Sequence, residues 1–330
     1  MWPPSPNYVT HRSTRCYSSP DLVDGTLGGL VVQRIVGSVL ALLGAFLITV
    51  GVLAQFYAEP RLEKTPLDVD STTLLSGTVQ LSDGSGGLEE SPVKAFSVTK
   101  ADSERSDDGV VVFANSSCLV KDEGDIDTCV SADDPQDRLV SASTDNFATD
   151  RVTAMAVNDP QYLPPSAEEK TGLVNKWPFG AEKKTYPYWD GLAGEALDAV
   201  YDRSESIDGL EVYVYRVEQS GTPIELSAGV PGTLDAEKEL FIEPTTGSII
   251  DQVDSQQRMD ADGNPAIVLD LAFTDEQVAA NVEDSKSNAA SLDLLTGTVP
   301  IIGYAAGIPA LIIGLVLLVL SFRRRSNSPA

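Results

Sequence analysis

The sequence predicts an α+β protein, with a mainly antiparallel β domain and a long C-terminal helix flanked by two transmembrane helices. Two uncharged apolar runs, Ile35–Phe56 and Val299–Phe322, are each long enough to cross a hydrocarbon core of about 30 Å as a helix. Between them, short strand-like runs are separated by glycine- and proline-containing turns. A helix-capping pattern precedes the second apolar run.

The N-terminal region divides into a tail and a first membrane span. Residues 1–34 are rich in proline and serine, which predicts a disordered cytoplasmic tail. Residues 35–57 form the predicted first transmembrane helix. A cleaved signal peptide with Val52-Leu53-Ala54 as its cleavage site is the alternative. The apolar run is longer than a signal-peptide core, and 34 residues precede it, so we expect a retained anchor.

Residues 58–298 are predicted to form an extracytoplasmic β-rich domain. The prolines of Tyr162-Leu-Pro-Pro165 break regular structure, so a subdivision near 160–170 stays open. Two hairpins are expected, one turning at Asp208-Gly209 and one at Pro244-Thr-Thr-Gly247. The strand candidates are Leu74–Leu81, Val93–Thr99, Val110–Phe113, Cys118–Val120, Leu197–Ser206, Glu211–Val217, Leu240–Glu243, Ser248–Val253 and Ala266–Phe273.

The C-terminal region is predicted to be helical. Thr274 and Gln277 have the spacing of a capping box, and the helix that they begin should run to about Leu295. Residues 299–322 form the predicted second transmembrane helix. Residues 323–330 form a basic cytoplasmic tail.

The basic residues predict the orientation in the membrane. Arginines precede the first span and follow the second, which marks both termini as cytoplasmic and the central domain as extracytoplasmic. Without these six arginines and two N-terminal acids, the totals of 23 basic and 49 acidic residues leave a formal charge of about −30 between the spans. This charge argues against nucleic acid as a partner. The flanking arginines are Arg12, Arg15, Arg34, Arg323, Arg324 and Arg325.

The cysteines and the histidine limit the chemistry of the domain. Cys118 and Cys129 lie outside the cell, eleven residues apart, and we expect a structural disulfide that stabilises the fold by about 2–3 kcal/mol. Cys16 lies in the cytoplasmic tail, as does His11, the only histidine of the chain. The absence of histidine from the outer domain excludes Ser-His-Asp centres and histidine zinc sites there. Catalysis by carboxylates or by a Ser-Lys pair stays open, but no pattern in the sequence marks it, so we predict no catalytic residue, metal or cofactor.

Glycines recur along both predicted spans. Small residues on one stripe of a helix let two backbones approach closely. The two spans are therefore expected to pack on each other or on a membrane partner, although glycine is also common in transmembrane helices. The glycines are Gly37, Gly44 and Gly51 in the first span and Gly303, Gly307 and Gly314 in the second.

The stretch Trp177–Asp190 is the densest in aromatic residues. Its rings would suit a membrane interface or the mouth of an apolar pocket, with lysines near a lipid headgroup. An aromatic core with two solvated lysines is the alternative. The residues predicted to contact lipid are Trp177, Phe179, Lys183, Lys184, Tyr186, Tyr188 and Trp189.

Two motifs resemble the actinobacterial PorA family. One is Trp-Pro-Phe-Gly followed by Lys-Lys-Thr-Tyr-Pro-Tyr-Trp-Asp within residues 177–190, and the other is Phe241-Ile-Glu-Pro-Thr-Thr-Gly247. The family pattern usually begins with Phe-Pro-Phe, whereas this chain has Trp177. The order of an early span, an outer domain and a late span followed by arginines also matches, over residues 35–325.

The resemblance implies a non-enzymatic protein of the cell envelope. Some relatives are implicated in mycolate-glycolipid transport and lipoglycan maturation, so we expect the outer domain to bind or hand over a lipid or glycolipid, with a membrane transporter as partner. The family label also implies a porin. We discount a pore formed by this chain alone, because its strands lie in an acidic soluble domain. The alternative function is a membrane scaffold that binds proteins through its spans and outer domain, without lipid.

Overall fold

The computed structural model describes residues 24–83, 87–124 and 126–326. The described chain forms two compact units. One comprises the residues up to Gln55 together with those from Thr298 onward, and the other comprises Phe56–Gly297. Residues 1–23 of the predicted N-terminal tail, with His11 and Cys16, lie outside the described residues, whereas residues 24–34 are helical and form the start of α1.

The first unit is built from two long helices. Helix α1 spans Asp24–Leu53 and continues as a π-helical turn, η1, at Ala54–Ala58, while helix α4 spans Val299–Ser326. Within the described part of the chain, Val31–Ala58 and the helical stretch Asp275–Arg323 are long and apolar enough to cross a membrane.

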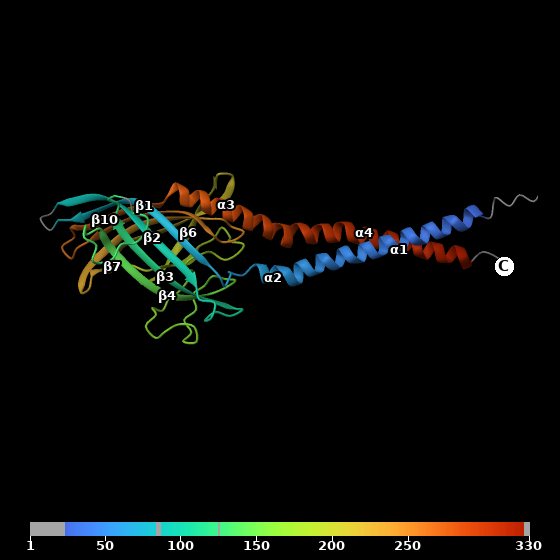
Figure 1. The fold of residues 1–330 in the computed structure, drawn as a ribbon, viewed down its shortest axis with the longest axis horizontal. Helices are drawn as coiled ribbons and strands as arrows, with labels where there is room; N and C mark the ends of the chain where they lie inside the picture. Colours follow the sequence, from blue (N-terminus) through green and yellow to red (C-terminus); the bar gives the residue numbers. More distant parts are fainter. Residues whose placement is uncertain (1–23, 84–86, 125, 327–330) are drawn as a thin grey trace, which may run out of the picture. The chain divides into compact units, whose positions relative to one another are not determined.

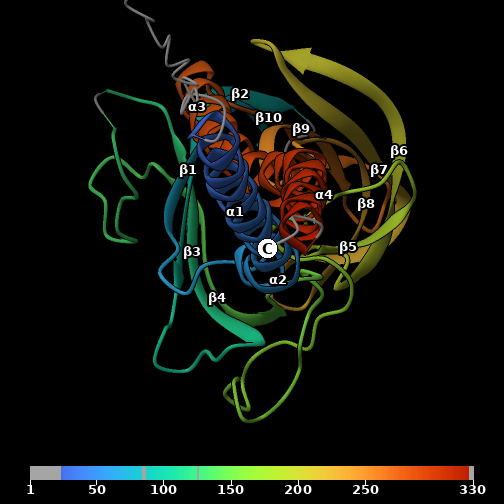
Figure 2. The same ribbon diagram turned by 90° about the vertical axis from the view of Figure 1, so that its right-hand side faces the viewer.

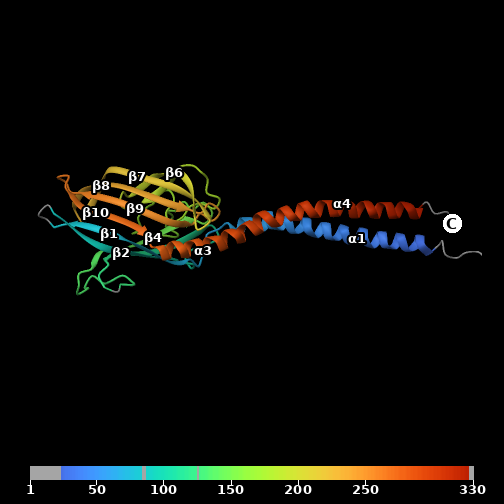
Figure 3. The same cartoon turned by 90° about the horizontal axis from the view of Figure 1, so that it is seen from above.

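Glycines form the contact between α1 and α4, which lie side by side in Figure 3. A Cβ on Gly44 would overlap the backbone nitrogen of Leu311, and one on Gly314 would overlap that of Ala41. Gly37, Gly51, Gly303 and Gly307 also face the opposite helix.

Polar side chains also join the two helices. Arg34 Nε donates to Ser321 Oγ at 3.0 Å, and Tyr304 Oη donates to Gln55 Oε1 at 3.0 Å. Because such groups lack water partners within a membrane, each bond specifies how the helices align.

The second unit is one antiparallel sheet of ten strands (Figure 1). Its spatial order is β4-β3-β2-β1-β10-β9-β8-β7-β6-β5, so the first and last strands of the chain are neighbours. The strands are β1 Asp70–Ser82, β2 Leu88–Ala101, β3 Val110–Lys121, β4 Leu139–Asp150, β5 Tyr186–Asp190, β6 Glu195–Ile207, β7 Leu210–Ser227, β8 Val230–Ile242, β9 Ile249–Met259 and β10 Pro265–Phe273. The short helix α2 (Glu59–Leu62) precedes the sheet, and α3 (Asp275–Leu292) with the π-helical turn η2 (Asp293–Thr298) follows it.

The sheet curls so that its edge strands β4 and β5 approach each other (Figure 2). Isolated bridges link them in steps: Thr149 pairs with Ala156, Met155 with Leu173, and Leu173 with Tyr188. The connection at 151–185, which contains the proline pair, thus runs between the two edges.

The structure confirms the predicted fold class and both hairpins. Strands β6 and β7 pair across Asp208 and Gly209, whose positive φ angles of 47° and 82° form the turn that the dipeptide predicts. Strands β8 and β9 pair across the second predicted turn. Two expectations need correction: β3 is one continuous strand, and the aromatic segment contains a strand, β5.

Helix α3 begins at the predicted cap. Thr274 Oγ1 accepts a hydrogen bond from Gln277 N at 3.2 Å. The reciprocal half of the capping box is absent, because Gln277 Oε1 instead accepts from Leu74 N at 3.0 Å, and Thr274 N donates to Leu74 O. The capping residues therefore attach α3 to strand β1.

The predicted disulfide between Cys118 and Cys129 is confirmed. It fastens the loop after β3 over a small core that includes Phe96, Val120 and Ile126. The bridge thus fixes a loop whose apolar contacts are few.

Replacing Gly44 by alanine should destabilise the helix pair, because the new methyl group overlaps the Leu311 backbone. We expect a loss of about 1–3 kcal/mol in the free energy of unfolding, typical of overpacked sites. Gly51→Ala is the matched control, since its Cβ would lie 3.4 Å from Pro300 O in ordinary contact. Thermal unfolding of both variants in detergent, followed by circular dichroism, measures the difference. Equal stability would contradict the packing described.

Candidate functional site

The predicted lipid-contact aromatics form a closed core. The side chain of Trp177 is 0% exposed and packs against Tyr188 and Tyr215, with ring centroids 5.2 and 5.1 Å away. Tyr186 is also buried and meets both Trp177 and Tyr215 edge-on. These rings hold the Trp177 segment (residues 177–181) against the sheet.

The β8–β9 turn, Pro244–Gly247, docks on the Trp177 segment. Trp177 N donates to Gly247 O at 2.8 Å, and Ala181 N donates to Pro244 O at 2.7 Å. Gly247 has a φ of 73°, and a Cβ there would overlap the carbonyl oxygen of Trp177, so glycine is required. Buried Glu243 fixes the turn by accepting from Thr245 N and Thr246 N. The two motifs noted in the sequence are therefore halves of one contact.

The predicted lysines lie on the surface. Lys183 Nζ stands 4.7 Å from the ring centre of Tyr213, and Lys184 Nζ forms an ion pair with Glu182 at 2.6 Å. Both lysines are exposed. Trp189 is buried, with Lys170 Nζ 4.9 Å from its ring centre. The predicted set thus divides between core and surface, and its role in lipid binding stays a prediction.

Phe179 differs, because it lines an apolar cavity of about 290 Å³, here called the apolar pocket. Helices α2 and α3, η2 and the β8–β9 turn supply the rest of its wall. Leu62 and Leu295, which line the pocket, are 39% and 38% exposed. Its apolar side chains are Leu62, Pro66, Phe179, Leu292 and Leu295, and Lys64 and Lys176 are its basic residues.

Lys176 is the chemically distinctive residue of this pocket. It is half-buried, its Nζ lies 3.8 Å from the ring centre of Phe179, and no ion pair joins it to any other described residue. Burial lowers the pKa of Lys176 to about 8, although nearby Glu243 acts in the opposite direction. Glu243 is already bound to the turn, and Lys64 is paired with Asp108 at 2.9 Å.

A second cavity, here called the polar chamber, has a volume of about 580 Å³. Alternate residues of β1–β4 form one side, while residues 174–176, Tyr188 and parts of β9, β10 and α3 complete it. Pro66, Lys176 and Ser248 line both cavities, so the two adjoin. Six polar residues of its β1–β4 side are Ser71, Thr73, Ser97, Thr99, Asn115 and Asp145.

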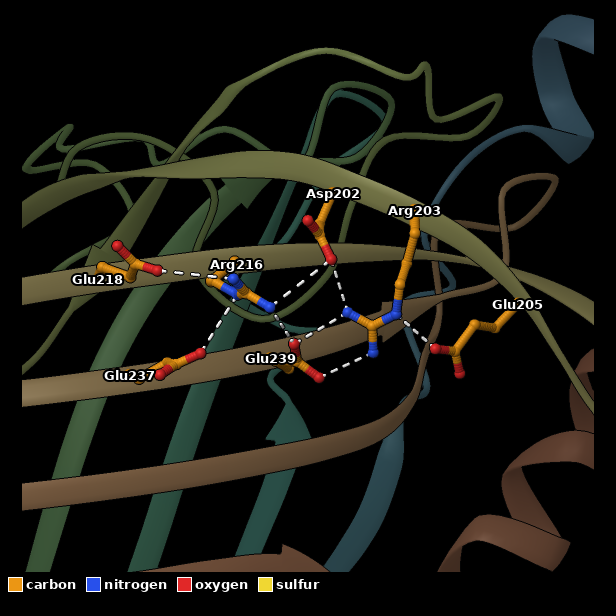
Figure 4. Close-up of polar contacts among 7 residues, drawn as sticks. All are labelled: Asp202, Arg203, Glu205, Arg216, Glu218, Glu237 and Glu239. Carbon is orange, nitrogen blue, oxygen red and sulfur yellow. Dashed lines mark hydrogen bonds and ion pairs between the residues drawn. The ribbon is translucent and has the colours of Figure 1, made fainter.

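Figure 4 shows a third cluster, a network of charged residues across β6, β7 and β8. Glu239 accepts from Arg203 at 2.9 and 3.0 Å and from Arg216 at 2.9 Å. The hydrogen bond from Arg203 lowers the pKa of Glu239 to about 2. Both arginines are already paired, so the network aligns three strands and offers no free cation to a ligand. Its other carboxylates are Asp202, Glu205, Glu218 and Glu237.

Lys238 provides a contrast with Lys176. Its Nζ lies 3.3 Å from Asp254 and 3.6 Å from Asp190, and both carboxylates are buried. Burial alone would lower the pKa of Lys238, but the two carboxylates outweigh it and raise the pKa. Lys238 therefore forms ion pairs with two buried carboxylates, whereas Lys176 forms no ion pair with any described residue.

Sequence reasoning missed Lys176 and the polar chamber. Lys176 directly precedes the singled-out aromatic segment, but no local pattern reveals that distant Leu62 and Leu295 would enclose it. The sequence does contain a signal for the polar chamber. Ser71 and Thr73 are two positions apart in β1, so their polar side chains lie on the same face of the strand.

Comparison with known proteins agrees with the motifs. The family model described as "Porin PorA" matches residues 36–316. A protein named Porin PorA from Corynebacterium amycolatum is 28% identical over 219 residues, covering 56% of this chain and 57% of the relative. Another protein of that name, from Corynebacterium resistens, is 26% identical over 251 residues, which cover 63% of this chain and 58% of the relative. The chain thus spans less than two thirds of the length of these relatives.

Proposed function

The chain belongs to the PorA family of membrane proteins, and we propose that it is a non-enzymatic, two-pass envelope protein whose outer domain binds a membrane lipid. The observation that carries this proposal is half-buried Lys176, which lies in the apolar pocket and forms no ion pair with any residue that the structure describes. The flanking arginines support cytoplasmic termini and an extracytoplasmic domain.

The pocket lies close to the membrane along the chain. Leu62 follows the first apolar run, which ends at Phe56, by six residues, and Leu295 precedes the second, which begins at Val299, by four. This nearness in sequence to both apolar runs supports a membrane lipid as the ligand of the pocket.

The chemistry of the pocket suits an anionic amphiphile. A phosphate or carboxylate would supply the ion-pair partner that Lys176 lacks among the described residues, and the leucines and Phe179 would cover the adjoining apolar atoms of the ligand. A cavity of about 290 Å³ accommodates a headgroup with a short apolar segment, not whole acyl chains. The rest of the lipid would remain outside the pocket.

The acidity of the domain does not oppose this local attraction. At physiological salt, charges more than about 8 Å apart are largely screened on a protein surface. The ammonium group of Lys176 would therefore govern a headgroup bound beside it. We infer that the domain presents or hands over its lipid to a membrane transporter during envelope assembly, as the family resemblance implies.

Replacing Lys176 by methionine should weaken lipid binding at least tenfold, because the headgroup loses its cation while the apolar wall is retained. The measurement is a calorimetric titration of the full chain in detergent with short-chain phosphatidylglycerol at pH 7. Lys184→Met is the control, since Lys184 is exposed and already paired with Glu182. Equal binding by Lys176→Met and the native chain would refute this assignment of the pocket.

Stability should depend on pH through Lys176. Its pKa is about 8 in the folded protein, below the ordinary value of 10.5, so the unfolded chain holds more protons between these values. The contribution of Lys176 to the free energy of unfolding therefore rises with pH across this window, by about 1–3 kcal/mol. Urea titrations at pH 7.5 and 10.5 measure the change. The rise should be smaller in Lys176→Met, and an identical rise in both proteins would contradict the prediction.

Pore formation is a second candidate, since the relatives are named porins. The glycine stripes of α1 and α4 face each other, so a channel would require several copies associating through other helix faces. Planar-bilayer recordings of the purified full chain test this. We expect no unitary conductance steps. Reproducible steps that Gly44→Ala alters and Lys176→Met leaves unchanged would favour the pore over the lipid site.

A further inference from the structure

The polar chamber presents hydrogen-bonding groups that the fold does not use. Thr65 is 4% exposed and lines the chamber, yet its Oγ1 has no hydrogen-bond partner among the described residues. The buried Oδ1 of Asn175 likewise lacks a partner there. Within the same described part of the chain, the hydroxyl groups of Ser71 and Thr73 make no hydrogen bond to protein. The buried atoms of Thr65 and Asn175 are costly unless a ligand or water satisfies them, whereas Ser71 is exposed and Thr73 is half-buried.

The character of these groups indicates the class of ligand. Hydroxyl groups donate and accept, and amides offer both functions, so together they match a molecule that carries many hydroxyl groups of its own. Asn115 Nδ2 donates to Ser97 Oγ at 2.9 Å and to Thr99 Oγ1 at 2.8 Å, which orients these hydroxyls. Some lining hydroxyl groups are therefore held in place by Asn115, and other polar groups of the lining have no hydrogen-bond partner among the described residues.

Charge and shape narrow the choice further. The carboxylate of Asp145 is neutralised by Lys170 at 3.1 Å, so this wall of the chamber presents little free charge. Phe113, Phe147 and Tyr188 supply apolar ring surfaces beside the polar groups. A volume of about 580 Å³ lies within the range of small-molecule sites. An acyl chain would leave the hydroxyl and amide groups unsatisfied, and a highly charged ligand would find only one unpaired charged side chain, Lys176, among the described lining residues.

We infer that the polar chamber binds a neutral carbohydrate, one or two sugar rings in size. The hydroxyls of Thr65, Ser71 and Thr73 and the amide of Asn175 hydrogen-bond to the sugar, and the aromatic rings cover its apolar face. Because Pro66, Lys176 and Ser248 also line the apolar pocket, a sugar joined to an anionic lipid head would occupy both cavities. That last connection rests on the proposed function, whereas sugar binding itself does not.

Saturation-transfer NMR of the full chain in detergent tests the inference with glucose, galactose, mannose, arabinose and maltose as probes and glycerol as the control. At least one sugar should show saturation transfer from the protein to its C–H protons, and glycerol at the same concentration should show none. The paired change Thr65→Val with Thr73→Val preserves side-chain shape and removes two hydroxyls, so affinity should fall at least tenfold without loss of thermal stability. Thr78→Val is the control. Thr78 is an exposed residue of β1, the strand that contains Thr73, and it does not line the chamber, so this variant should bind the sugar as the native protein does.

The outcomes separate this inference from the proposed function. No transfer to any of the five sugars, or unchanged affinity in the Thr65→Val, Thr73→Val variant, would overturn the carbohydrate site. Leu295→Asp, at a residue that lines the apolar pocket and not the polar chamber, should reduce binding of short-chain phosphatidylglycerol and leave free-sugar binding within twofold. If the native chain binds a free sugar but does not bind short-chain phosphatidylglycerol, the lipid proposal is refuted and the carbohydrate site is retained.

Discussion

The docking of the Pro244–Gly247 turn on the Trp177 segment is the contact on which both cavities depend. It joins residues about seventy positions apart in the chain and needs a glycine where any side chain would overlap a carbonyl oxygen. Once docked, the segment places Lys176 and Phe179 in one pocket with the C-terminal ends of α2 and α3. Trp177, Tyr186 and Tyr188, with Tyr215 of β7, form the aromatic core that supports this contact, whereas the lining of the two cavities comes largely from other segments.

The two units are stabilised by different physical means. Between α1 and α4, glycine allows close backbone contact and a few polar side chains set the alignment, because lipid offers no hydrophobic advantage to helix association. In the second unit, Phe56–Gly297, buried aromatic and branched side chains supply most of the favourable free energy, and ion pairs such as Arg203–Glu239 mainly align neighbouring strands. The domain can therefore tolerate its acidic surface.

Local chemistry made much of the fold predictable. The apolar runs, the Asp208-Gly209 turn and the Thr274 cap each carry their signal within a few residues. Strand β4 was missed because Ser141–Asn146 is polar on both faces and only Phe147–Thr149 is buried. Strand β5 was missed because its aromatic residues resembled a binding surface. The lining of the apolar pocket could not be read from the sequence, since its walls meet only after the sheet has curled and the turn has docked.

The neighbouring positions of β1 and β10 have a mechanical consequence. Leu75 pairs with Phe273, so the segments that lead to the two membrane helices leave the sheet from the same end of one strand pair. Tension on those segments would load the hydrogen bonds of this pair one after another, like a zipper, rather than all together in shear. Thr274 and Gln277, both bound to Leu74, close that end. The capping residues of α3 thus act as a latch against forces transmitted from the membrane.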